Sequence, residues 1–228
     1  MTTHPSSPDF LTLPPLTMPL EEAIRTQRAL RRLKPDPLDD ALVLRLVELA
    51  LKAPTGRNAQ NWAFVLVKDR AVKARLARLY RLAWGLYGRL GRRLTARDPK
   101  MQGQLDAVQW QVEHFEDIPV LVVACLHGIR PVWPALMVTS YYGSIYPSVQ
   151  NLLLAARAAG LGAALITLPL WSIWLVRRAL RLPWRVTPCA IVPLGWPMGR
   201  YGPTTRRPVG EVVHLDRYGH QPFRTPQP

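Results

Sequence analysis

The sequence predicts one globular domain that combines helices with buried strands. The chain has 228 residues, of which 48% are hydrophobic, and this size and composition allow a sizeable core. Continuous apolar runs at residues 62–67, 118–126 and 188–195 are typical of buried strands. Between them lie stretches with apolar residues at helical spacing. We expect the domain to occupy residues 19–228, after a flexible, proline-rich arm at residues 1–18.

The strongly basic charge is compatible with several kinds of partner. The net charge is +15 and the pI is about 10.8, which suits nucleic acid, an anionic membrane or phosphorylated small molecules. No zinc-finger, RNP-like or clear helix-turn-helix motif is visible, so we do not expect nucleic-acid binding. The longest weakly charged stretch, residues 131–176, is interrupted by prolines, glycines and Arg157. This pattern favours a buried core over a membrane span.

The two cysteines are expected to be buried free thiols. Cys125 and Cys189 each lie in an apolar run, without a CxxC motif or a histidine cluster nearby. A disulfide framework and a zinc site are therefore not expected. Because no signal peptide is visible at the start of the chain, we expect a cytoplasmic protein that does not insert stably into a membrane.

An arginine cluster follows the expected arm. A proline and two glutamates at residues 19–22 predict the start of a helix, which should continue to Leu33, before two prolines. On such a helix, Arg28 would share one side with Arg31 or with Arg32. Guanidinium groups bind phosphate bidentately, so the cluster could form a phosphate site. A basic surface turn explains the same residues equally well.

A short polar turn ends the next predicted helix and opens the strand at residues 62–67. Pro54 should stop the helix, and Thr55, Gly56 and Asn58 are turn formers. Gly56 also allows a ligand to approach the backbone closely. The segment could hold a flat polar ligand, or it could be an ordinary connection between a helix and a strand.

The helix expected at residues 70–94 is amphipathic and rich in arginine. It could be a lid, a membrane-surface helix or a helix with a solvated basic face, and we expect the last of these. Its predicted apolar side consists of Leu76, Leu79, Leu82, Ala83, Leu86 and Leu90.

The rest of the chain contains further helices and strands. We expect helices at about 101–115, 144–159 and 171–182, a strand at 163–168, and an irregular loop at 131–142. The 144–159 helix is apolar nearly all round, so it should lie in the core or in a subunit interface.

Taken together, these motifs resemble the FMN-dependent nitroreductases. Four blocks follow in the family's order and span about residues 21–218. They are the arginine motif RTQRALRRLKPDP at 25–37, the turn APTGRNAQNW at 53–62, the helix GSIYPSVQNLLLAAR at 143–157 with its GLG end at 160–162, and the closing VPLGWP with RRPVGEVVH at 192–214. The second block is similar to the family's APSGxNxQPW motif.

The resemblance implies an α+β fold with a mixed, mainly antiparallel sheet flanked by helices. It also implies an intertwined homodimer that binds FMN at two interface sites, with the C-terminal extension as an exchanged arm. The implied reaction passes a hydride from NAD(P)H through flavin N5 to an electron-poor acceptor, such as a nitroaromatic or a quinone, by ping-pong exchange. No catalytic side chain is required. Dehalogenation, flavin cleavage and azoline oxidation remain alternatives on the same fold, and a basic nucleic-acid- or membrane-surface-binding protein is the alternative from another class.

The resemblance also assigns the flavin contacts. Arg28 and Arg31, with Ala29 beside them and Arg32 as an alternative, would hold the phosphate and the pyrimidine edge. Arg206, or Arg207, would reach the phosphate from the other end of the chain. The remaining contacts would come from Pro54, Thr55, Gly56 and Asn58 of the partner subunit, and from Leu165, Ile166 and Thr167 near N5.

The chain departs from the family's pattern in three places. Gln27-Arg28-Ala29 replaces the common Arg-Arg-Ser, which removes a hydroxyl, and Asn61 replaces the proline of the QPW part. The aromatic segment 127–143 matches no family motif, and we expect it to contribute to the acceptor pocket. The sequence leaves open the acceptor, the choice between NADH and NADPH, and the segment that covers the flavin.

Overall fold

A four-stranded antiparallel sheet forms the centre of the molecule. The computed structural model describes residues 13–128 and 130–224. The strands lie in the order β1-β2-β4-β3, and each pairing among the described residues is antiparallel. Their bounds are β1 Trp62–Val67, β2 Val120–His127, β3 Gly162–Ala163 and β4 Val186–Gly195. The three apolar runs of the sequence are therefore confirmed as strands β1, β2 and β4, and the α+β prediction is also confirmed.

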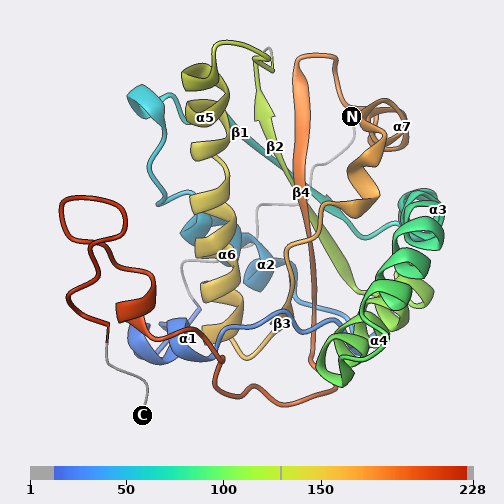
Figure 1. The fold of residues 1–228 in the computed structure, drawn as a ribbon. Helices are drawn as coiled ribbons and strands as arrows, with labels where there is room; N and C mark the ends of the chain where they lie inside the picture. The colour runs from blue at the N-terminus through green and yellow to red at the C-terminus, as the bar shows by residue number, and fades with distance from the viewer. Residues whose placement is uncertain (1–12, 129, 225–228) are drawn as a thin grey trace.

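Helices cover both faces of this sheet (Figure 1). Alternate residues of β2 point to opposite sides, as the two-residue period of a strand requires. Leu121 and Val123 pack into one core with helices α3, α4 and α7, whereas Val122 and Ala124 pack into the other with α2 and α6. The helix bounds are α2 Asp40–Ala50, α3 Arg70–Leu94, α4 Pro99–Glu113, α6 Tyr146–Ala158 and α7 Ile173–Leu180. The helix expected at residues 144–159 is thus confirmed as α6, and six of its 13 residues are buried.

Acidic N-caps fix the starts of the long helices. The side chains of Asp39, Asp69 and Asp98 accept backbone hydrogen bonds at the starts of α2, α3 and α4, respectively. Such caps satisfy amide groups that the helix itself leaves unpaired. They explain why α3 and α4 begin at or close to the positions that the sequence predicts.

The first helix is much shorter than predicted. Helix α1 covers Leu20–Thr26, and the chain is extended from Gln27 onwards. The Leu30 amide donates to the carbonyl of Ala163 at 3.1 Å, and Leu33 forms an antiparallel bridge with Pro197. These tertiary pairings replace helical hydrogen bonds. The expected helix to Leu33 and the helical spacing of its arginines are therefore wrong.

Two other expected elements differ from the prediction. The loop expected at residues 131–142 contains helix α5, Ala135–Gly143, and Pro134 is its N-cap residue. The strand expected at residues 163–168 is reduced to β3 and an isolated bridge between Ile166 and Ile191, followed by the 3₁₀ helix η3, Leu168–Trp171.

The N-terminal end of the described chain is held against α2, whereas the C-terminal segment extends away from the body. Residues 1–12 of the expected arm lie outside the described residues, while the carbonyls of Leu13 and Pro14 each accept a 2.7 Å hydrogen bond from Arg45. The C-terminal segment contains the 3₁₀ helix η4, Val209–Glu211, and projects from the body beside α1 (Figure 1).

None of the described helices has both the length and the apolar character needed to cross a membrane.

Candidate cofactor site

Two adjoining cavities lie between the arginine segment, the α3–α4 pair and the C-terminal segment. One has a volume of about 510 Å³ and is mainly polar. The other has a volume of about 390 Å³ and has aromatic side chains in its wall. Arg31 and Gln104 line both of them. The joined cavity therefore has a cationic end and an aromatic end, and each part is within the size range of small-molecule sites.

Segments from the two ends of the chain build the cationic end. The extended segment after α1 contributes Arg28 and Ala29, and the C-terminal segment contributes Arg206. The two segments are held together because the amide and the hydroxyl of Thr204 both donate to the carbonyl of Arg25, at 3.3 and 3.2 Å. No acidic side chain lines this cavity among the described residues. Its chemistry suits an anion such as a phosphate.

Arg31 lies where the two cavities meet. Its Nε is buried and has no hydrogen-bond partner among the described residues. Burial also lowers the pKa of the Arg31 guanidinium from its ordinary value. A buried donor without a partner costs about 1–3 kcal/mol. A ligand with an acceptor at this point would remove that cost.

The aromatic end is formed by α3, α4 and the chain after β3. Tyr80, Trp84 and Tyr87 of α3 line it together with Ile166 and Thr167. Two glutamines of α4 fix two of these rings. Tyr80 donates to the Gln111 side chain at 3.2 Å, and Trp84 donates to the Gln109 side chain at 2.5 Å. The cavity wall is thus preorganised for a flat aromatic molecule.

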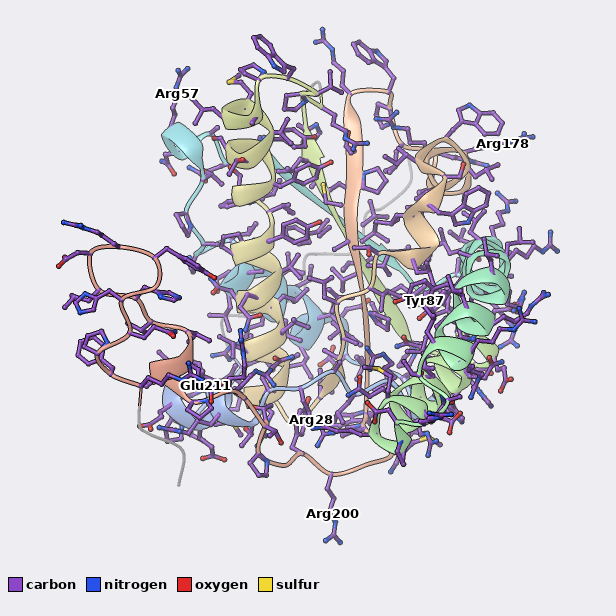
Figure 2. The ribbon with its side chains drawn as sticks, viewed as in Figure 1. Arg28, Arg57, Tyr87, Arg178, Arg200 and Glu211 are labelled. Atoms are coloured by element: carbon purple, nitrogen blue, oxygen red, sulfur yellow. The ribbon has the colours of Figure 1, made fainter. Side chains whose placement is uncertain are left out.

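The turn before β1 lies apart from this cavity in the same protomer. Figure 2 shows Arg57 of the turn and Arg28 of the cavity at different ends of α6. The turn forms the 3₁₀ helix η2, Gly56–Asn58, and the Gly56 amide donates to the Ser144 hydroxyl at 3.3 Å. The indole of Trp62 donates to the Ser144 carbonyl at 2.6 Å. The turn is therefore attached to the start of α6.

The backbone of this turn is strained. Arg57, Asn58 and Gln60 all have positive φ, at 57°, 52° and 46°. Residues other than glycine adopt this conformation at a cost of about 1–3 kcal/mol, and such positions cluster at functional sites. The exposed, strained turn is thus a candidate contact surface.

The structure brings together seven of the thirteen predicted contacts. Those that line the joined cavity are Arg28, Ala29, Arg31, Leu165, Ile166, Thr167 and Arg206. Those that do not line it in the same protomer are Arg32, Arg207, Pro54, Thr55, Gly56 and Asn58. The segment expected to form the acceptor pocket also does not line it; the wall comes instead from α3 and α4.

Sequence reasoning did not assign Tyr80, Lys100 and Gln104 to the site. Trp84 and Tyr87 had an indirect signal, because they lie in the arginine-rich stretch at residues 70–94 that could form a lid. Lys100 and Gln104 had none, since single polar residues on a helix are common at any surface.

The metal-ligating and thiol side chains of the described residues do not form a second cluster. Within the described residues there is no cluster of three or more histidine, cysteine or acidic side chains that could bind a metal ion. Cys125 and Cys189 are free and buried, and they pack into the cores on opposite faces of the sheet. Burial raises the pKa of each thiol to about 12. Neither is therefore a reactive thiolate near neutral pH.

The fold and cavity belong to a known class of protein. The model of the nitroreductase family matches residues 24–196 of the chain. An NADH dehydrogenase of Thermus thermophilus is 30% identical over 218 residues, which cover 89% of this chain and 97% of the relative. The chain therefore belongs to the nitroreductase family, a class of oxidoreductases.

Two further proteins show the range of this likeness. A putative NADH dehydrogenase/NAD(P)H nitroreductase of Methanothermobacter thermautotrophicus is 25% identical, with 88% of each chain covered. The crystal structure of oxidized iodotyrosine deiodinase bound to FMN and 3-iodo-L-tyrosine has a TM-score of 0.68 and 22% identity, covering 88% of this chain and 98% of the neighbour. At this identity the structural likeness concerns the fold alone.

Proposed function

We propose that this chain is an FMN-dependent oxidoreductase that passes a hydride from NAD(P)H to an electron-poor acceptor, such as a nitroaromatic or a quinone. The observation that carries the proposal is the joined cavity, which has arginines at one end, aromatic rings at the other, and the unpaired Arg31 Nε between them. FMN has the same polarity, because its phosphate is anionic and its ring system is flat and aromatic. The residues of the cavity therefore fit the cofactor.

Each part of the cavity has a distinct role in this proposal. Arg28 and Arg206 would bind the phosphate by charge-assisted hydrogen bonds, with Arg32 and Arg207 as the alternatives. Arg31 would donate to the pyrimidine edge, and a cation there favours negative charge on the ring. Leu165, Ile166 and Thr167 would lie along the edge near N5, and Ala29 near the phosphate.

When bound, FMN would supply the chemistry of hydride acceptance and transfer. The protein would supply the position of each reactant. Tyr80, Trp84 and Tyr87 line the aromatic end beside the flavin ring, where NAD(P)H and the acceptor would bind in turn. Exclusion of water from that cavity would limit side reactions. This arrangement predicts ping-pong kinetics.

A second copy of the chain would complete the site. Pro54, Thr55, Gly56 and Asn58 do not reach the cavity of their own protomer, and they are held in an exposed, strained turn. We propose that these turn residues contact the cofactor bound by the partner subunit in a homodimer. The C-terminal segment, which projects from the body, would then exchange between subunits.

Steady-state kinetics with FMN-reconstituted protein test the proposed reaction. NADH and NADPH are varied against a nitroaromatic and against a quinone, and the absorbance of the reduced nicotinamide is followed. We expect turnover with at least one donor and parallel double-reciprocal lines.

The competing reactions on this fold give a different result. If the reconstituted protein oxidises neither NADH nor NADPH in the presence of these acceptors, the proposed reaction is wrong. Iodide release from 3-iodotyrosine, fragmentation of reduced flavin or oxidation of an azoline would then identify the alternative.

A further inference from the structure

Helix α3 exposes an apolar stripe that the fold does not cover. Leu82, Leu86, Leu90 and Leu94 follow one another at four-residue spacing, and their exposed fractions are 66%, 78%, 54% and 75%. Residues at this spacing lie on one side of a helix. The stripe extends about 18 Å along the helix axis, at about 1.5 Å per residue. Half of the apolar side predicted from the sequence, Leu82, Leu86 and Leu90, is therefore on the surface and not in the core.

The same helix carries an unusually one-sided charge. Its 25 residues contain seven arginines and one lysine and have no acidic residue. Arg70, Arg81 and Arg92 are paired with Asp117, Glu116 and Asp106, at 3.0, 3.0 and 2.8 Å. The arginines left without an acidic partner among the described residues are Arg75, Arg78, Arg89 and Arg93. The exposed leucines are thus bordered by free positive charge.

The 3₁₀ helix η3 and helix α7 extend this surface with Trp171 and Trp174, respectively. Trp171 is 55% exposed and its indole donates to the carbonyl of Leu79 on α3 at 3.1 Å. Trp174 is 65% exposed and lies under the guanidinium of Arg178, 5.7 Å from its ring centroid. Figure 2 shows Arg178 projecting outward on the side of the molecule where α3 lies. Tryptophan and arginine together are typical of groups that lie at a membrane interface.

We propose that this surface, which we call the α3 outer face, binds the anionic surface of a lipid bilayer. The leucine stripe would enter the boundary between headgroups and acyl chains, while the bordering arginines would reach lipid phosphates. Attachment would be peripheral, since no described helix can span the membrane. The face consists of Leu82, Leu86, Leu90, Leu94, Arg75, Arg78, Arg89, Arg93, Trp171 and Trp174.

Charge complementarity favours a lipid surface over other occupants. A second copy placed on this face would bring two strongly basic helices together, which is unfavourable. Nucleic acid would satisfy the arginines but would leave the four leucines in contact with phosphate and water. An anionic bilayer complements both the charge and the apolar stripe.

Sedimentation with vesicles tests the proposal. The full chain is mixed with phosphatidylcholine vesicles, with or without phosphatidylglycerol, at low and high salt. We expect binding that requires phosphatidylglycerol and weakens at high salt, because it depends on screened charges. Leu86→Glu/Leu90→Glu should weaken binding at least tenfold, and so should Arg89→Gln/Arg93→Gln.

A matched variant controls for the added charge. Leu20→Glu/Ile24→Glu places two acids at the same spacing on α1, where the side chains are 67% and 55% exposed. This variant should keep most of the binding, because α1 lies away from α3 (Figure 1). Thermal unfolding and light scattering show whether all variants have the fold and the oligomeric state of the wild type.

Three results would overturn the proposal. The first is failure of the wild type to bind phosphatidylglycerol vesicles. The second is binding of the two α3 variants that is as tight as that of the wild type. The third is loss of self-association or of DNA binding in those variants when the wild type does not bind vesicles. The last result would assign the face to a second copy or to nucleic acid. These outcomes do not depend on FMN or on turnover.

Discussion

Arg31 is an unfavourable residue for the protein without a ligand, because its buried Nε has no acceptor within residues 13–128 and 130–224. Replacing it with methionine should therefore leave the stability of the FMN-free protein unchanged or raise the free energy of unfolding by up to about 1 kcal/mol. The same change should weaken FMN binding at least tenfold. Urea unfolding of the FMN-free protein and quenching of FMN fluorescence measure the two effects.

Arg31→Lys is the control for this prediction. Lysine keeps the charge but cannot reproduce the guanidinium fork, so FMN affinity should be intermediate. A large loss of stability in the FMN-free Arg31→Met protein would show that Arg31 is a structural residue, and would contradict its assignment to the cofactor.

The buried thiols predict a loss of stability in alkaline solution. Burial raises the pKa of Cys125 and Cys189 from 9.0 to about 12 in the folded state. Below pH 9 the two thiols are protonated in the folded and in the unfolded chain, so they leave the free energy of unfolding unchanged with pH. Between pH 9 and about 12 only the unfolded chain ionises, so stability should fall by about 1.4 kcal/mol per pH unit for each thiol.

Cys125→Ala isolates this effect. The substitution leaves a small cavity at every pH, so the slope of stability against pH is the quantity to compare. Urea unfolding from pH 8 to 10 should give a shallower slope in the variant. Some slope should remain in the variant above pH 9, because Cys189 is unchanged and the pKa of Tyr80 and Tyr201 is also raised to about 12. Identical slopes in the two proteins would contradict the burial of an ionisable Cys125.

At the scale of single elements, the turn before β1 stores backbone strain. Arg57 has φ of 57° and an exposed side chain. Arg57→Val should lower the free energy of unfolding by about 1–2 kcal/mol, since a β-branched residue adopts positive φ poorly. Arg57→Gly should be neutral or slightly stabilising, because glycine adopts this conformation freely. Thermal unfolding distinguishes the two, and equal destabilisation would mean that the side chain, and not the backbone, matters.

The strands and long helices could be predicted because local and tertiary preferences agree in them. Strand β2 is apolar and buried up to its last residue, His127, and lies between two helical layers, so its sequence and its environment specify the same structure. Helix α3 begins at an aspartate cap and continues with good helix formers.

The elements that could not be predicted depend on distant partners. Residues after Thr26 have good helical propensity, but Leu30 and Leu33 pair with segments that are more than a hundred residues away. Helix α5 could not be recognised because Pro131 and Pro134 precede it closely, although Pro134 at the N-cap is compatible with a helix start. Local patterns cannot reveal either outcome.

The site itself was predictable only in part. The family resemblance located Arg28, Arg31, Thr167 and Arg206, and the structure places all four on the joined cavity. The contribution of α3 and α4 to the cavity wall could not be read from the sequence, because it depends on how these helices pack against η3. The exposure of the leucine stripe on α3 could not be predicted for the same reason.

For the molecule as a whole, the proposed cofactor site requires two copies of the chain. If the cavity of one copy is completed by the turn of the other, two inactive variants should complement each other. Arg28→Ala/Arg206→Ala removes cationic groups, and Thr55→Ala/Asn58→Ala changes the turn. Mixing the two unfolded variants and refolding them together should give mixed dimers with one intact site.

The flavin content of the mixture measures this complementation. Mixed dimers should retain FMN at about one site in two, while each variant refolded alone should retain little. A monomer by light scattering, or a mixture that retains no more FMN than the separate variants, would contradict the shared site.

The central claim, that the joined cavity binds FMN, is tested most directly by titrating the FMN-free protein with FMN and following flavin fluorescence. The wild type should bind one FMN per chain and turn yellow. Arg28→Ala/Arg206→Ala should remain folded and bind at least a hundredfold more weakly, since it loses two charge-assisted contacts of about 1.5–3 kcal/mol each. The control Arg178→Ala/Arg200→Ala removes the same charge from exposed positions outside the cavity and should bind like the wild type. Equal affinity in the Arg28/Arg206 variant, or no FMN binding by the wild type, would contradict the account.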